Sequence, residues 1–102
     1  MSLIHLEKEN YDDLIKEGIV VVDFFANWCG PCKMLGPVIE RLSDEISSVN
    51  FVKVDVDKHE QLARRYAVMS IPTLIFIKDG KEVNKHIGFI SADAIKEIIE
   101  KI

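Results

Sequence analysis

The sequence of 102 residues predicts one α/β domain, a mixed β-sheet with helices on both faces. Segments with strand-like and helix-like patterns alternate along the chain, which is typical of a βαβ arrangement. Residues 19–26 form an apolar run that only Asp23 interrupts, as in a central strand covered on both faces. Near the C-terminus, Asp79-Gly80 separates two strand-like segments and predicts a β-hairpin. A closing helix after that hairpin completes the prediction.

The first half of the chain is expected to supply two strands and two helices. Residues 4–6 predict a short first strand, and Asn10 is expected to cap a short helix that Gly18 ends. After the strand at 19–26, a long helix presents one broad apolar face, made of Met34, Leu35, Val38, Ile39, Leu42 and Ile46. Pro37 lies within this helix and should kink it, because proline lacks an N–H and clashes with the preceding turn.

The second half is expected to supply a strand, a short helix, two strands of a hairpin and a last helix. Their expected ranges are 51–57, 60–66, 73–77, 82–87 and the residues after Ser91. Gly88 should end the second hairpin strand, and Ser91 should cap the last helix. That helix is expected to turn Ala94, Ile95, Ile98 and Ile99 inward.

Both cysteines of the chain lie in the segment Trp28-Cys29-Gly30-Pro31-Cys32-Lys33. A disulfide between them closes so short a ring that the gain in stability is modest, so reversible redox chemistry is the expected use. Half of a zinc site is the alternative, but a structural zinc needs four ligands and the three histidines are isolated. Two inert thiols are a further alternative. Gly30-Pro31 argues against it, because this is turn chemistry at a helix start, where thiols become reactive.

Composition and charge narrow the classes of partner. The net charge of −4 and the lack of a basic cluster argue against nucleic acid. Apolar runs are all too short to cross a bilayer, so no membrane partner is expected. Residues 1–7 contain no basic start, no long apolar region and no cleavage site, so no secretory signal is expected and a cytoplasmic address fits best.

Residues 22–33 resemble the active-site segment of thioredoxins, and Ile71-Pro72-Thr73 followed by residues 78–81 is similar to the second signature of that family. The order and spacing of elements match over residues 4–102. The resemblance implies a thioredoxin fold in one domain, 1–102, with a central mixed sheet of about five strands flanked by four helices. Phe25 departs from the pattern, because many thioredoxins carry a second tryptophan there.

Cys29 is the candidate nucleophile, because a sulfur at a helix start faces unpaired N–H groups and the positive end of the helix dipole, which favour thiolate. Cys32, one turn along, would be the resolving thiol; the resemblance implies the same two roles. We expect Cys29 to be accessible and Cys32 to be largely buried. Gly30 and Pro31 are expected to set the backbone and the redox balance.

Asp23 is a carboxylate in an apolar strand, so burial should raise its pKa and fit it to exchange a proton with Cys32. A hydrogen-bonded structural aspartate is the alternative; the resemblance favours proton transfer. Lys53 should lie on the neighbouring strand, where its ammonium group would hold part of the Asp23 charge. Alternatively, Lys53 extends from an exposed face to solvent.

The resemblance also implies a docking surface for substrate. It implies that Pro72 is cis and faces the disulfide, which leaves the Ile71 backbone free to pair with an extended substrate. An ordinary trans proline at a strand edge is the alternative. The expected apolar rim around Cys29 consists of Trp28, Val56, Ile71, Gly88 and Phe89, with Met69 as a weaker candidate. Taken alone, each of these residues is better explained as a core residue or as a chance apolar group on the surface.

These observations predict a small dithiol–disulfide oxidoreductase that reduces protein disulfides, acting as a protein disulfide reductase or electron carrier in cell redox homeostasis. The chain has no nucleotide-binding glycine motif, so a separate thioredoxin reductase, NADPH- or ferredoxin-dependent, would recycle it. No cofactor beyond the Cys29–Cys32 disulfide, no metal and a monomeric state are expected. A disulfide isomerase or oxidase of the same fold, and a non-catalytic thioredoxin-like subunit of a larger complex, remain open.

Overall fold

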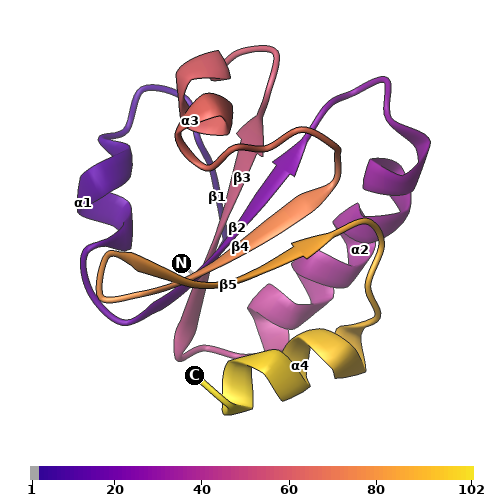
Figure 1. The fold of residues 1–102 in the computed structure, drawn as a ribbon. Helices are drawn as coiled ribbons and strands as arrows, with labels where there is room; N and C mark the ends of the chain where they lie inside the picture. Colours follow the sequence, from indigo (N-terminus) through magenta and orange to yellow (C-terminus); the bar gives the residue numbers. More distant parts are fainter. Residues whose placement is uncertain (1–2) are drawn as a thin grey trace.

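The computed structural model describes residues 3–102, in which strands and helices alternate as predicted (Figure 1). The elements are β1 (Leu3–His5), α1 (Tyr11–Ile15), β2 (Ile19–Phe25), α2 (Gly30–Glu45), β3 (Val49–Asp55), α3 (Glu60–Arg65), β4 (Thr73–Lys78), β5 (Lys81–Ile87) and α4 (Ala92–Glu100). Met1 and Ser2, which are part of the segment expected to contain no signal, lie outside the described residues.

The five strands of the described chain form one mixed sheet in the order β1-β3-β2-β4-β5. β3 pairs in parallel with β1 and β2, while β4 is antiparallel to both β2 and β5. β2 is therefore central, and its register places Asp23 between Lys53 on β3 and Leu74 on β4. The predicted mixed sheet flanked by four helices is confirmed.

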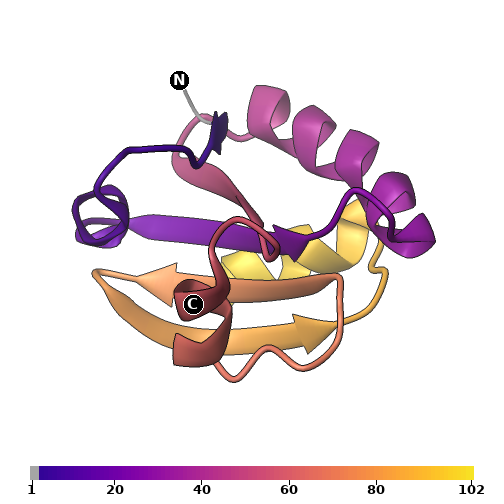
Figure 2. The same ribbon diagram turned by 90° about the horizontal axis from the view of Figure 1, so that it is seen from above.

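Two helices cover each face of the sheet, so the core has two layers (Figures 1 and 2). On one face, α1 and α3 pack on even-numbered residues of β2 such as Val22 and Phe24. On the other face, α2 and α4 cover Val21 and its neighbours in β3 and β4. Asp23 shares the face of Val21, because side chains alternate along a strand, so it lies on the α2 side of the sheet.

Local hydrogen bonds explain where several elements begin and turn. The Asn10 side chain accepts the N–H of Asp13, and the Ser91 hydroxyl accepts the N–H of Ala94, which confirms both predicted caps. The hairpin between β4 and β5 turns through Asp79 (φ 50°) and Gly80 (φ 85°), two left-handed residues in the pattern expected for Asp-Gly.

The largest error in the predicted boundaries concerns β3, which spans Val49–Asp55 and not residues 51–57. The strand begins at Val49 because this residue pairs with Ile19. It ends at Asp55 because the Asp55 side chain accepts the N–H of Asp57 and its carbonyl accepts that of His59, which turns the chain. Helix α1 ends at Ile15, three residues before Gly18, which was expected to end it. The ends of the remaining elements differ from prediction by a residue or so, as with β1, which begins at Leu3. Over residues 3–102, none of the helices has the length and apolar character needed to cross a bilayer.

Candidate functional site

The two cysteines lie at the carboxyl end of β2, where the chain enters α2. Cys29 is the N-cap residue of α2, and its Sγ accepts the N–H of Cys32 at 3.2 Å. Pro31 stands in the first helical turn, where its missing N–H leaves no helical hydrogen bond unmade. A disulfide joins Cys29 and Cys32, so the described state is the oxidised one.

The expected contrast in accessibility between the two cysteines is wrong for this oxidised state. Cys29 is 5% exposed and Cys32 is 4% exposed, so both are buried. They pack with Ala26 in one apolar cluster, against which Val56 and Ile71 also lie. Cys29 is covered because the loop before β4 folds over it, with its Sγ 3.8 Å from the Ile71 carbonyl oxygen.

The loop before β4 brings a second segment of the chain to the disulfide. The Ile71–Pro72 peptide bond is cis, as the resemblance implies, and Pro72 is buried. The Pro72 carbonyl accepts the N–H of Gly88 at 2.8 Å, so the end of β5 lies beside this loop. Residues from three separate stretches therefore meet near Cys29.

The residues expected to form an apolar rim differ in exposure. Trp28 is 70% exposed and Phe89 is 46% exposed, which is unusual for large apolar side chains. Val56 and Ile71 are half-buried against the cysteine cluster, and Gly88 is half-buried. Met69, the weaker candidate, is almost fully exposed. The structure thus places Val56 and Ile71 at the cysteines and leaves the two large aromatic side chains open to solvent.

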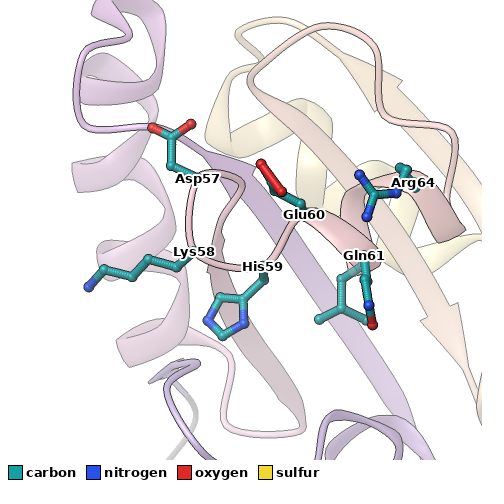
Figure 3. A pocket seen from close by; sticks show the side chains of 7 residues that line it. Asp57, Lys58, His59, Glu60, Gln61 and Arg64 are labelled. Carbon is teal, nitrogen blue, oxygen red and sulfur yellow. The ribbon is translucent and has the colours of Figure 1, made fainter.

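Asp57 belongs to this site and was missed by the sequence analysis. Its Oδ2 accepts the indole N–H of Trp28 at 2.9 Å. It also lines a polar hollow of about 390 Å³ between the end of β3 and α3 (Figure 3). The signal was available, because parallel strands β2 and β3 end at the same edge of the sheet, so residues just after them are neighbours.

Replacing Asp57 by alanine is expected to free the indole ring of Trp28. Because Trp28 is the only tryptophan, its fluorescence anisotropy reports this residue alone. We expect lower anisotropy, because the exposed hydrogen bond that restrains the ring is lost. Asp57→Asn retains an acceptor and is the matched control. Unchanged anisotropy in Asp57→Ala would show that the hydrogen bond does not hold the ring.

Asp23 is 1% exposed, and neither carboxylate oxygen has a hydrogen-bond partner among residues 3–102. This burial raises the pKa of Asp23 from 3.8 to about 6, while the ammonium group of Lys53 opposes the rise. The predicted burial of Asp23 is confirmed. The alternative of a hydrogen-bonded structural aspartate finds no support.

Lys53 approaches Asp23 from β3, with Nζ 3.9 Å from Oδ2. Its side chain is 11% exposed, so the predicted pairing is confirmed and extension into solvent is not observed. A hollow of about 260 Å³ lies beside this pair, and its lining includes both Cys32 and Lys53. The hollow therefore brings Cys32 and Lys53 to one surface, while Asp23 is not part of its lining. Within the described residues, no group of three or more His, Cys, Asp or Glu side chains is arranged to hold a metal ion.

Comparison with known proteins places these features in context. Residues 2–101 match the family model described as Thioredoxin. The chain is 49% identical over 96 residues to a thioredoxin of Chlamydia trachomatis, covering 94% of each chain. It is 46% identical over 102 residues to one of Staphylococcus saprophyticus, covering 99% of this chain and 98% of the relative. A mutant thioredoxin from Halobacterium salinarum superposes with a TM-score of 0.90 at 36% identity, covering 98% and 89% of the two chains.

Proposed function

The chain belongs to the thioredoxin family and is a dithiol–disulfide oxidoreductase, and we propose that it acts as a reductase of protein disulfides with Cys29 attacking and Cys32 resolving. The observation that carries the proposal is the position of the Cys29–Cys32 disulfide at the first turn of α2. At that position the Cys29 sulfur caps the helix and accepts the N–H of Cys32, and the Cys32 sulfur follows one turn later.

The reaction starts from the reduced dithiol. The Cys29 thiolate attacks one sulfur of a substrate disulfide, forming a mixed disulfide and expelling the other substrate sulfur as a thiolate. Cys32 then loses its proton and attacks the Cys29 sulfur, which expels the second substrate sulfur. Two electrons have passed to the substrate, and the protein is left with the Cys29–Cys32 disulfide, the state described here.

Asp23 is proposed to take the proton that Cys32 loses in the second step. Its support is the raised pKa of about 6, which lets the carboxyl accept a proton near neutral pH and return it. The carboxylate oxygens are free of hydrogen bonds within the described chain, and Cys32 and Lys53 line the same hollow. Lys53 is proposed to keep part of the Asp23 population charged between turnovers.

Substrate docking is proposed to use the exposed rim and the loop before β4. Trp28 and Phe89 offer exposed apolar surface. Val56 and Gly88 are half-buried and Pro72 is buried, so they contribute less of that surface. The Ile71 backbone lies beside Cys29, where an extended substrate segment can add to it. Backbone pairing of this kind is independent of sequence, which suits a reductase with many substrates. Gly30 and Pro31 are proposed to tune the redox balance.

The partners of such a reaction are disulfide-containing proteins and a reductase that returns the electrons. We assign the second role to a thioredoxin reductase, NADPH- or ferredoxin-dependent. The protein is proposed to act as a cytoplasmic monomer without a cofactor beyond its own disulfide.

The reduction potential of the Cys29–Cys32 couple tests the proposed direction of the reaction. Equilibration with glutathione, read by the fluorescence of Trp28, is expected to give about −270 mV, the value typical of thioredoxins. A potential above about −180 mV would instead identify an oxidase or isomerase. Trp28→Phe, followed by mass spectrometry after thiol alkylation, controls for effects of the reporter itself.

A further inference from the structure

We propose that Phe25 is a positioning residue for this reaction: the face of its ring holds the ammonium group of Lys53 against the buried carboxylate of Asp23. The proposal rests on the roles assigned above to Asp23 and Lys53, and adds a third residue that acts through them. Phe25 is the position at which this chain departs from the tryptophan of many thioredoxins.

The geometry follows from the sheet. Asp23 and Phe25 are two residues apart on β2, so their side chains project from the same face. Lys53 lies directly opposite Asp23 on the parallel strand β3. Its Nζ is 3.9 Å from Asp23 Oδ2 and 4.6 Å from the centre of the Phe25 ring. The ammonium group thus lies within reach of a carboxylate and over a ring face, the arrangement of a cation–π contact.

Helix α2 closes the third side of this arrangement through Gly36. A Cβ placed on Gly36 would lie 3.7 Å from Lys53 Nζ, so the helix backbone stands directly beside the ammonium group. The pair, the ring and the helix therefore define one position for Nζ. At 3.9 Å the ion pair is longer than a hydrogen bond, so the attraction to Asp23 alone does not fix a flexible lysine chain.

Without the ring, the ammonium group has two ways to leave. Hollows of about 260 and 200 Å³ both have Phe25 and Lys53 in their lining. The other charged or titratable side chains that line them are Lys33, Glu40, His5, Glu7, Asp55 and Lys58. Once the ring is removed, we expect the carboxylates among them to draw Lys53 away from Asp23. The Phe25 ring opposes that loss, because it attracts Nζ at a position that also lies close to Asp23.

The test follows the titration of Asp23 in the oxidised protein by carbon NMR of its carboxyl group. Removing the ring in Phe25→Leu or Phe25→Met is expected to move the midpoint upward by about one pH unit, because a neighbouring cation lowers a carboxyl pKa by at least that much. Phe25→Trp, which retains a ring face, is expected to leave the midpoint in place. The direction is diagnostic: a merely loosened structure admits water, which moves the midpoint downward.

A double-variant cycle asks whether Phe25 acts through Lys53. Lys53→Met should raise the midpoint, and adding Phe25→Leu to Lys53→Met should change it no further. Equal, additive shifts in the two backgrounds, or a downward shift in Phe25→Leu and Phe25→Met, would overturn the proposal. The titration is independent of the proposed proton transfer. If Asp23→Asn resolves mixed disulfides at the parent rate, the catalytic role of Asp23 fails while the Phe25 result stands.

Discussion

Replacing Cys29 by serine is expected to lower the turnover of protein disulfides by at least roughly 10³-fold, whereas Cys32→Ser is expected to trap substrates as stable mixed disulfides. The two variants differ because the steps differ. Serine at position 29 supplies no thiolate, so no covalent intermediate forms. Serine at position 32 leaves the first attack intact and removes the sulfur that resolves it.

Mass spectrometry of each variant with a disulfide-bonded substrate protein measures the trapped species. A variant with both cysteines replaced by serine is the matched control and should trap none. Accumulation of mixed disulfides by Cys29→Ser, with none by Cys32→Ser, would reverse the assignment.

Exposure does not separate the two sulfurs in the oxidised state, since both cysteines are buried. Their difference in the reduced protein is therefore expected to come from the helix N-terminus, and alkylation at neutral pH should label Cys29 first.

The fold was predictable because its determinants are local. The apolar run of β2, the caps Asn10 and Ser91 and the Asp79-Gly80 turn each depend on residues adjacent in sequence. The end of β3 was missed because the alternating pattern continues beyond Asp55, whereas a hydrogen bond to the Asp55 side chain already turns the chain there. Pattern length alone does not report such a side-chain bond.

Features of the site that depend on tertiary contacts were harder to predict from the sequence. Burial of Asp23 followed from its apolar neighbours in the strand. Lys53 was expected on the neighbouring strand, but the register that sets it opposite Asp23 comes from the pairing of β2 with β3. The burial of Cys29 did not follow, because Ile71, 42 residues later, covers it. The hydrogen bond from Trp28 to Asp57 joins residues 29 apart and depends on two strands ending at one edge. The resemblance pointed to the loop at Pro72, which the dipeptide alone left open.

Replacing Asp23 by asparagine is expected to stabilise the oxidised fold at neutral and alkaline pH by about 3 kcal/mol. The estimate comes from the rise of the Asp23 pKa from 3.8 to about 6, a difference of about 2 units at 1.36 kcal/mol each. A raised carboxyl pKa means that folding favours the protonated form. The Asp23 side chain therefore costs no stability below pH 3.8, and its destabilising contribution grows as the pH rises from 3.8 to about 6 and is complete above that value.

Urea unfolding at several pH values measures this difference. Protonated aspartic acid and asparagine are both neutral, so the two proteins should be similarly stable at pH 3.5, and the gap should widen up to about pH 7. Asp44→Asn, an exposed carboxylate on α2, is the matched control and should show no such widening. Adding Lys53→Met to both proteins tests whether an unpaired Lys53 reduces the gain. A gap that does not grow with pH would mean that Asp23 is not held as a destabilised buried charge.

The same substitution, Asp23→Asn, is expected to slow the second chemical step while leaving the first intact. An asparagine amide cannot accept the Cys32 proton, so resolution of the mixed disulfide should fall by roughly 10²-fold, the usual contribution of a general base. The parent rate should rise with pH through a midpoint near 6, where Asp23 becomes able to accept that proton, and the variant should lack this step. Stopped-flow fluorescence of Trp28 separates attack from resolution. If Asp23→Asn is more stable and resolves the mixed disulfide at the parent rate, Asp23 is a buried charge without a catalytic role. If the variant is more stable but resolves the mixed disulfide slowly, the fold retains this destabilising carboxyl for its chemistry.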